Sequence, residues 1–485
     1  MGTPIPANRV ELDARAVAAA TASVGGRVVS ADRGAVARGV TTDSRAVTHG
    51  CAFVALRGTT HDGHAFVPAA IDAGAALVVV ERGRLPDGYG GRARADAVEV
   101  DDTLAAWGAL AREHLRRWRA SRDGARVVCI TGSAGKTTTK EMCAAMLREV
   151  GECLATAGNL NNRVGLPAVA LAVEPRHRFV VLEAGMNLPG EIAALGAIAE
   201  PDVAVVTNVG LAHAGGVGGT LDDVAREKGA LFAAVRAGGC VVANADDPAV
   251  VSQLERASSA IRVTFGRDAR ATVRLVARDA VGLEGSRAVV ERAGRRDTFD
   301  VPVAGEVAAL DFVAALAAAE AAAGPIDHTL VARALRAMAP LTGRMHTRRL
   351  GDVVVLDDAY NANPASMRAA LATLAEVGPG RRLAVLGEMK ELGPAAESEH
   401  AAIGAAAAAA GVALLVSCGG LADVAASAAA RAGVEVILAP DAVRAAAAVV
   451  ERVRPGDAVL VKASRSVGAE VVVEALAARA APGRS

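Results

Sequence analysis

Six residues, Gly132-Ser133-Ala134-Gly135-Lys136-Thr137, form the segment whose chemistry is easiest to infer. They follow a short apolar run at 127–130 and lead into a helix-like stretch. Backbone N–H groups at the start of a helix lack intrahelical partners and attract anions. Lys136 would add positive charge for the terminal phosphates, and Thr137 a hydroxyl ligand for Mg²⁺. The segment therefore predicts nucleotide binding through Gly132, Ser133, Ala134, Gly135, Lys136, Thr137 and Thr138.

The spacing of this phosphate loop differs from the common G-x-x-x-x-G-K-[ST] pattern. Position 130 is Ile130 and the first glycine is Gly132, so the loop has the shorter form G-x-x-G-K-T. A short G-x-x-G-K sequence also occurs in ordinary turns. The strand-like run before the loop and the helix-like stretch after it favour phosphate binding.

Short, continuously apolar runs alternate with helix-length segments through the rest of the chain. Such runs predict parallel sheets covered by helices on both faces. Nearly every run ends in residues able to do chemistry, namely Glu183, Thr207-Asn208, Asn244-Ala245-Asp246, Asp357-Asp358, Gly387-Glu388 and Lys462-Ala463-Ser464-Arg465. Ligands of open α/β sheets bind beyond the carboxyl ends of the strands. Two facing sheets would therefore place these groups around one cleft.

Three residues after such runs are candidates for metal binding or catalysis. Glu183 could hold Mg²⁺ opposite Thr137, although an exposed turn glutamate would explain it as well. His213 lies in the glycine-rich segment 208–216 and, taken alone, is typical of a loop histidine. Lys228, taken alone, is typical of a solvated lysine. The residues by themselves leave these alternatives open.

The length of 485 residues predicts about three domains, each able to bury its own core. We place an N-terminal domain at 1–100, a central domain at 101–343 and a C-terminal domain at 344–485, with Gly343-Arg344 as the hinge. The expected fold class is α/β, with a central, mostly parallel sheet covered by helices on both faces. A Rossmann-like C-terminal domain and a small N-terminal α/β domain complete it. The polar stretch from about 267 to 300 predicts a small antiparallel addition.

Composition argues against several classes of function. The chain has 53 basic and 53 acidic residues and only 2% aromatic residues, so neither charge nor base stacking favours a nucleic-acid partner. Six scattered cysteines without a C-x-x-C pair are typical of reduced thiols in the cytoplasm. No signal peptide is evident, and Ala401 to Val416 predicts a helix followed by a buried strand instead of membrane insertion. We expect a cytoplasmic globular enzyme.

Further motifs occur in a fixed order along the chain. They are Asp43–Arg45, Phe53–Gly58 and Asp62–His64, then Gly158–Asn162, Glu183–Met186 and Asn208–His213, and finally Asp357–Met367 and Val385–Gly393. Together with the phosphate loop, this set resembles the Mur ligases. The two C-terminal motifs narrow the resemblance to the MurF branch. The resemblance covers essentially the whole chain, which makes it far more specific than the loop alone.

The resemblance implies a ligase of peptidoglycan precursor synthesis that uses ATP and Mg²⁺. Its substrates would be UDP-N-acetylmuramoyl-tripeptide and D-alanyl-D-alanine. A substrate carboxylate would attack the γ-phosphate of ATP, giving an acyl phosphate and ADP. The amine of D-alanyl-D-alanine would then attack the acyl carbon and release phosphate. We expect a monomer, and the third residue of the tripeptide, lysine or diaminopimelate, stays open.

The same resemblance implies roles for the catalytic and metal-binding candidates. Lys136 would neutralise phosphate charge, and Thr137 with Glu183 would hold Mg²⁺. His213 would belong to a second Mg²⁺ site. Lys228 matches the lysine that this family carbamylates with CO₂, which turns a cation into an anion with two oxygens.

Substrate contacts are implied in the same way. Arg344 and Asp358 would be ATP-side contacts that complete the site when the domains close. Asn361, Asn363 and Ser366 would help to receive the dipeptide. The remaining expected substrate contacts are Ser44 and Arg45 on the uridine-diphosphate side, and Asn159 and Asn162.

Two segments depart from the family pattern. The family usually has Lys-Gly-Glu where this chain has Lys228-Gly229-Ala230, so a helper carboxylate is missing. At the positions of residues 305–311 the family usually has Gly-x-His-Asn-x-x-Asn, in which an asparagine would lie near adenine. In this chain Val307 replaces the histidine, and Ala308 and Asp311 replace the first and second asparagines. The remaining candidates to hold adenine are backbone groups, Asn244 and Asp246.

Other functions stay open as alternatives. Another Mur-type ligase would add a different amino acid, and a catalytically silent homologue would bind nucleotide without turnover. A nucleotide kinase also uses a glycine-rich loop, but it has no evident use for the C-terminal motifs.

Overall fold

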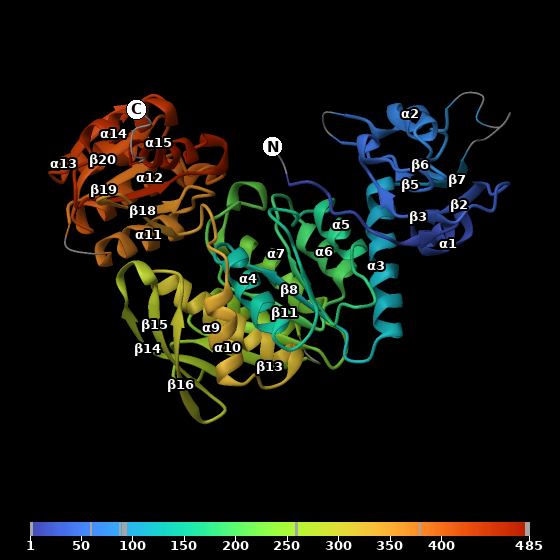
Figure 1. The fold of residues 1–485 in the computed structure, drawn as a ribbon, viewed down its shortest axis with the longest axis horizontal. Coiled ribbons are helices and arrows are strands. Elements are labelled where there is room, and N and C mark those ends of the chain that lie inside the picture. The colour runs from blue at the N-terminus through green and yellow to red at the C-terminus, as the bar shows by residue number, and fades with distance from the viewer. Residues whose placement is uncertain are drawn as a thin grey trace.

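The computed structural model describes residues 3–58, 61–86, 89, 95–257, 260–377 and 380–480. Three larger sheets follow one another along the chain, with helices between their strands. Figure 1 shows them side by side, with the N-terminal sheet at one end, the central sheet in the middle and the C-terminal sheet at the other end. The predicted α/β class is confirmed.

The N-terminal sheet has the strand order β2-β7-β6-β5-β4. Its strands are β2 (Arg27–Ser30), β4 (Val40–Thr41), β5 (Ala52–Val54), β6 (Leu77–Glu81) and β7 (Asp96–Val100). Two short strands, β1 (Glu11–Leu12) and β3 (Ala37–Arg38), pair separately, and the helices are α1 (Ala14–Ala20) and α2 (Val67–Asp72). The middle strands are parallel and buried on both faces, as their unbroken apolar sequences predict.

Helix α3 (Thr103–Ser121) connects the N-terminal sheet to the central one. It contacts α1 and β6 on one side and two helices of the central unit on the other. Its tryptophans, Trp107 and Trp118, are buried, and their indole N–H groups donate to the carbonyls of Val164 (3.0 Å) and His177 (3.1 Å). Since apolar residues of both units pack in one continuous core, α3 fastens the two units together.

The central sheet has the order β16-β15-β14-β13-β12-β11-β8-β10-β9. Its strands are β8 (Arg126–Thr131), β9 (Cys153–Ala155), β10 (Phe179–Glu183), β11 (Val203–Val206), β12 (Cys240–Asn244), β13 (Ile261–Gly266), β14 (Val273–Ala280), β15 (Ser286–Arg292) and β16 (Arg295–Val301). The strands from β9 to β14 pair in parallel, and β14 to β16 pair antiparallel. The predicted antiparallel addition is therefore confirmed.

Helices cover both faces of the central sheet. They are α4 (Lys136–Arg148), α5 (Gly165–Leu171), α6 (Glu191–Ala199), α7 (Leu221–Ala233), α8 (Pro248–Val251), α9 (Glu306–Ala323) and α10 (His328–Ala337). One face packs against α3, α5, α6 and α7, and the other against α4, α9 and α10. The sheet is thereby buried between two layers of helices.

The C-terminal sheet has the order β17-β18-β22-β19-β20-β21, in which only β17 is antiparallel to its neighbour among the described strands. The strands are β17 (His346–Leu350), β18 (Val353–Asp358), β19 (Arg382–Leu386), β20 (Val412–Cys418), β21 (Glu435–Ala439) and β22 (Ala458–Lys462). The helices are α11 (Pro364–Glu376), α12 (Ala396–Ala409), α13 (Ala422–Arg431), α14 (Ala442–Arg452) and α15 (Glu470–Ala480). Helices α11 to α13 cover one face, and α14 and α15 the other.

Polar contacts join the C-terminal unit to the central unit. Arg278 of β14 forms an ion pair with Glu376 of α11, and the side-chain amide of Asn363 donates to the carbonyl of Ser133 (3.3 Å). The Asn363–Ser133 contact brings the start of α11 against the phosphate loop, and the Arg278–Glu376 pair joins the end of α11 to β14.

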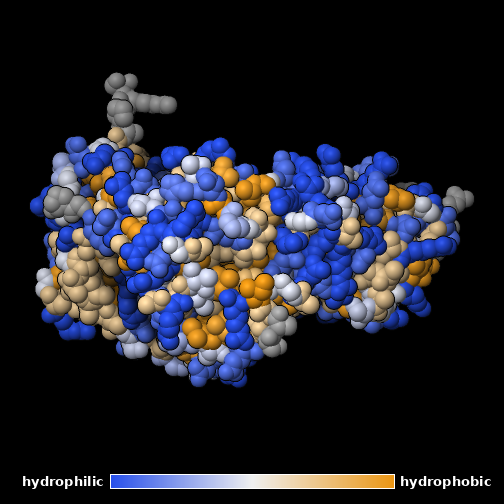
Figure 2. Space-filling model, turned by 90° about the horizontal axis from the view of Figure 1, so that it is seen from below, coloured by the Kyte–Doolittle hydropathy of each residue, from blue (hydrophilic) through white to orange (hydrophobic). Residues whose placement is uncertain are grey.

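The alanine-rich stretch Ala401 to Val416 contains the end of α12 and most of β20, as predicted. Among the described residues, no helix combines the length and the apolar character that crossing a membrane requires. The face in Figure 2 is mostly hydrophilic, and its apolar residues form separate patches.

Candidate active site

A cavity of about 610 Å³ lies between the central and C-terminal units. Of the groups predicted to share one cleft, those that line it are Glu183, Asp358, Lys462, Ser464 and Arg465. The prediction is wrong for the others, Thr207, Asn208, Asn244, Asp246, Asp357, Gly387 and Glu388, which are not part of the lining in the described residues. Several of these form hydrogen bonds with nearby backbone groups, and this structural role explains their place at strand ends.

The phosphate loop is held from the next strand along the sheet. Asn208 accepts a hydrogen bond from the backbone N–H of Ala134 (2.8 Å), and the hydroxyl of Thr207 donates to the carbonyl of Ala134 (2.6 Å). Gly132 and Gly135 have φ of +156° and +79°, and a Cβ at either position would collide with a neighbouring side chain. Helix α4 begins directly after Gly135 without a side-chain cap, so its first N–H groups are available to an anion.

Two lysine ammonium groups share one acceptor at this loop. Lys136 Nζ donates to the carbonyl of Gly132 at 2.8 Å, and Lys228 Nζ donates to the same carbonyl at 3.0 Å. Burial lowers the pKa of Lys136 and, together with the charge of Lys136, lowers the pKa of Lys228 well below its ordinary value. Lys228 is fully buried, so its interpretation as a solvated lysine is wrong. The pair concentrates positive charge where a phosphate would lie.

Glu183 ends β10 in register with Ile130 of β8, beside the loop. Its carboxylate accepts from the hydroxyl of Thr137 (2.6 Å) and from the side-chain amide of Asn161 (2.7 Å). Burial opposes ionisation, but Lys136, Arg344 and these hydrogen bonds outweigh it and leave the pKa of Glu183 below its ordinary value. Glu183 is buried, so the alternative of an exposed turn glutamate is wrong.

His213 lines the cavity and is paired across the two units. Its Nδ1 contacts the carboxylate of Glu391, which comes from the C-terminal unit. Both residues have positive φ, 62° and 66°, so each loop is bent locally to bring them together. Burial, followed by the charge of Lys136, lowers the pKa of His213.

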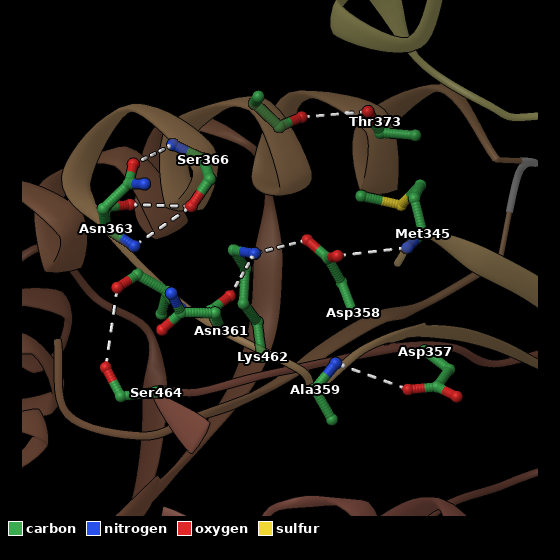
Figure 3. Close-up of polar contacts among 12 residues, drawn as sticks. Met345, Asp357, Asp358, Ala359, Asn361, Asn363, Ser366, Thr373, Lys462 and Ser464 are labelled. Carbon is green, nitrogen blue, oxygen red and sulfur yellow. Dashed lines mark hydrogen bonds and ion pairs between the residues drawn. The ribbon is translucent and has the colours of Figure 1, made fainter. Parts of the chain in front are cut away.

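A buried ion pair forms the C-terminal wall (Figure 3). Lys462 Nζ lies 2.5 Å from Asp358 Oδ2 and donates to the carbonyl of Asn361 (2.9 Å), while the backbone N–H of Met345 donates to Asp358 Oδ1 (3.0 Å). Burial raises the pKa of Asp358, although Lys462 opposes the shift. These bonds fix the strand ends from which neighbouring side chains enter the cavity.

Two arginines stack on one aromatic ring at the same wall. The guanidinium of Arg344 lies 4.2 Å from the ring centroid of Tyr360, and that of Arg465 lies 5.6 Å from it. All three residues line the cavity. The stacking orders the arginines before any anion binds.

Asn361, Asn363 and Ser366 also line the cavity, and each has a visible structural task (Figure 3). Asn363 and Ser366 form a reciprocal capping box at the start of α11, with bonds of 2.9 and 3.0 Å. The side chain of Asn361 accepts from the backbone N–H of Ala362 (2.9 Å). Their contact with a dipeptide stays a prediction.

The other expected substrate contacts fall into two groups. Asn159 and Asn162 line the cavity. The side chain of Asn162 accepts from the backbone N–H of Gly165 (2.8 Å), and that of Asn159 accepts from the hydroxyl of Thr3 (2.9 Å). Ser44 and Arg45 lie in the N-terminal unit, outside the cavity, where Arg45 pairs with Asp43. The structure therefore does not bring these two groups together.

The start of α9 forms the remaining wall, and the residues there include Val307, Ala308 and Asp311. The carboxyl of Asp311 lies behind Gly135, where burial raises its pKa to about 7 against the opposing effects of Thr139, Arg344 and Lys136. The prediction that Asn244 or Asp246 holds adenine is wrong. The side-chain amide of Asn244 donates to the carbonyl of Thr207, and Asp246 accepts from the N–H groups of Arg267 and Asp268, so neither faces the cavity.

Family models match three parts of the chain. They describe a Mur ligase catalytic domain at 36–115, a Mur ligase middle domain at 130–319 and a Mur ligase glutamate ligase domain at 343–465. The chain is also 35% identical over 441 residues to the UDP-N-acetylmuramoyl-tripeptide--D-alanyl-D-alanine ligase of Synechocystis sp., covering 90% of this chain and 92% of that relative. The chain belongs to the Mur ligase family.

Other members of the Mur ligase family show the same relationship. The ligase of the same name from Escherichia coli is 35% identical over 381 residues, 78% of this chain and 81% of the relative. A crystal structure of MurF from Acinetobacter baumannii aligns with a TM-score of 0.86 at 27% identity, over 97% of this chain and all of that one. MurF ligase from Thermotoga maritima in complex with ADP gives 0.80 at 28% identity, over 91% and 97%.

Several residues that line the cavity of this Mur ligase had no role predicted from the sequence. Glu391 and Tyr360 lie inside recognised motifs, but only the folded chain shows their partners, His213 and Arg344. Lys462 was visible only as a strand end. The Asn-x-x-Ser pattern at 363–366 was readable as a helix cap, because a polar residue before a proline-started helix is typical of one.

Replacing Asp311 by asparagine tests the buried carboxyl behind the loop. The folded pKa of about 7 lies above the ordinary 3.8, so the cost of burying this group grows as the pH rises from about 4 to 7. Asp311→Asn is expected to raise the free energy of unfolding at both pH values. The increase should be larger at pH 8 than at pH 5, by on the order of 2 kcal/mol. Urea unfolding at both pH values measures the difference.

The control for this experiment is Asp300→Asn, whose carboxylate is 75% exposed. It should change stability equally at the two pH values. An Asp311→Asn effect that is likewise independent of pH would contradict the raised pKa.

Proposed function

We propose that this chain joins D-alanyl-D-alanine to UDP-N-acetylmuramoyl-tripeptide, with conversion of ATP to ADP and phosphate. The observation that carries the proposal is the cavity itself, in which a phosphate loop faces arginines and asparagines of a second sheet. Relatives that carry this activity in their names align over most of both chains, which supports the same choice of substrates. The structure of one such relative with ADP supports the nucleotide.

The reaction needs positioning and charge neutralisation more than covalent help from the protein. The carboxylate of the tripeptide attacks the γ-phosphorus, the bond to the bridging oxygen of ADP breaks, and an acyl phosphate forms. The amine of the dipeptide then attacks the acyl carbon, loses a proton and displaces phosphate. Lys136 and the first amides of α4 stabilise the phosphate charge, and Arg344 approaches from the opposite wall.

Mg²⁺ suits the donor set at the loop. Thr137 and Glu183 offer a hydroxyl and a carboxylate, which are the hard oxygen ligands that Mg²⁺ takes together with phosphates and water. Among the described residues, no group of three or more His, Cys, Asp or Glu side chains could form a metal cage without help. A bound Mg²⁺ would neutralise charge on the transferred phosphate. We assign Thr137 and Glu183 to the first ion, and His213 with Lys228 to a second.

Carbamylation of Lys228 would change the electrostatics of the site. The unprotonated amine attacks the carbon of CO₂, an N–C bond forms, and the amine loses a proton, which leaves an anionic carbamate. The side-chain nitrogens of Lys228 and Lys136 share one carbonyl, so the conversion places a negative charge beside the Lys136 ammonium. Burial, which lowers the pKa of Lys228, favours the reactive amine.

We also propose the domain limits 1–100, 101–343 and 344–485, a division that the three larger sheets support.

The cytoplasm is the proposed location, because ATP is available there and the cysteines among the described residues are all free. We propose a monomer.

Phosphate release tests the ligase activity. Purified protein with ATP, Mg²⁺ and UDP-N-acetylmuramoyl-tripeptide should release phosphate in step with product only when D-alanyl-D-alanine is added. Lys136→Ala should lower kcat by about 100- to 1000-fold, because it removes a charge that acts on the transferred phosphate. Arg444→Ala, on the exposed face of α14, is the control.

The alternatives give different results in the same assay. Phosphate release with a single amino acid instead of the dipeptide would indicate another Mur-type ligase. Nucleotide binding without turnover for any substrate pair would indicate a silent homologue. Running the assay with the lysine and the diaminopimelate tripeptides identifies the third residue.

Lys228→Ala tests the carbamate separately from overall activity. With ¹³C-labelled bicarbonate, wild type should show a carbamate carbon signal in NMR that Lys228→Ala lacks. Lys390→Ala, in which a lysine that is 48% exposed is removed, should keep the signal. If Lys228→Ala is as active as wild type, with or without bicarbonate, the carbamate assignment is wrong.

A further inference from the structure

The two ends of the phosphate loop face different parts of the cavity. The carbonyl of Gly132 is held by Lys228, close to Glu183 and His213, whereas Gly135 packs against Asp311 of α9. The proposed phosphoryl transfer, on which this inference rests, takes place at the first of these ends. The nucleoside must therefore extend past Gly135, toward α9 and α11.

The cavity wall near Gly135 is lined mainly by apolar side chains. From the central unit it contains Val303, Ala304 and Ala308, which are buried, and Val307, whose surface is 36% exposed. Helix α11 contributes the face 369–373 from the other side. Apolar surfaces of this kind suit a planar base, because stacking and apolar contact need no matching polar group.

The polar side chains near this wall are already bonded. Glu306 pairs with Arg267 and Arg278, and the hydroxyl of Thr373 donates to the carbonyl of Ala369 at 2.9 Å. Figure 3 shows this last bond above the Asp358–Lys462 pair. The carboxyl of Asp311 packs against Gly135 of the phosphate loop. Among the described residues of 303–311 and 369–373 that line this wall, none is an asparagine or a glutamine.

The start of α9 supplies hydrogen-bond donors of a different kind. Gly305 provides no side-chain cap, so the first backbone N–H groups of this helix lack partners within it. They can donate to a ring nitrogen or a carbonyl oxygen, and every nucleobase carries such acceptors. Backbone donors of this type do not distinguish adenine from guanine.

We propose that this chain holds the nucleobase by shape and stacking between Val307 and the 369–373 face of α11, without side-chain readout, and that it uses GTP nearly as well as ATP. An amide that pairs with both N6 and N7 selects adenine, because guanine has acceptors at both positions. A pair of this kind distinguishes bases by about 5- to 150-fold. Val307 and Ala308 cannot form it.

The first test compares nucleotides on the wild-type protein. The ratio of kcat/KM for ATP to that for GTP, measured by product formation, should be below about 10. A ratio above this value would overturn the inference and leave the proposed ligase function intact. If neither nucleotide is turned over, the function fails, and calorimetric titration with ADP and GDP still decides the inference: Kd values within about tenfold of each other support it, and a larger preference overturns it.

The second test introduces an amide side chain at the start of α9. Ala308→Asn should raise the ATP-to-GTP ratio by about fivefold or more, mainly through the KM for GTP, because the new amide can pair with adenine only. Val307→Asn is a second variant at a more exposed position, in case the first does not fold. Val443→Asn, on the 66% exposed position of α14, is the control and should leave the ratio unchanged.

Each outcome of the second test decides the inference. A higher ratio in either asparagine variant places the base at the start of α9. An unchanged ratio in both folded variants means that the base lies elsewhere in the cavity.

Discussion

Charge buried at the carboxyl edge of the central sheet is the constraint on which the site depends. A buried charge is costly unless it is paired and hydrogen-bonded. Lys136 and Lys228 donate to one neutral carbonyl, and Glu183 is the carboxylate whose charge most clearly offsets Lys136. The site therefore carries positive charge that its own groups only partly compensate. A polyphosphate supplies the missing negative charge, so the same feature that costs stability provides affinity.

The three sheets are attached to one another in different ways. The N-terminal and central units share a continuous apolar core through α3. Separating these two units would expose buried apolar side chains to water, which is unfavourable. The C-terminal unit meets the central one through polar contacts such as Arg278–Glu376 and His213–Glu391. Polar interfaces of this kind are typical of domains that move relative to one another.

Local sequence predicted the features that depend on local rules. The phosphate loop, the parallel strands and the antiparallel addition each follow from the order of apolar, glycine and polar residues over short windows. The pairs that close the cavity could not be found this way, because His213 and Glu391, or Lys462 and Asp358, are far apart in the chain. The strand-end rule predicted too many cleft residues, since a polar group at a strand end also satisfies neighbouring backbone. The domain limits and the roles of individual residues stay predictions.

The placement of the tryptophans determines what an optical experiment on this protein would detect. The chain has two tryptophans, and both lie on α3, with their indole groups hydrogen-bonded to carbonyls of the central unit. Their emission would therefore follow the packing of α3 on the central unit and would respond little to movement of the distant C-terminal sheet. A tryptophan placed on α11 would instead report closure of the cavity against a nearly constant background.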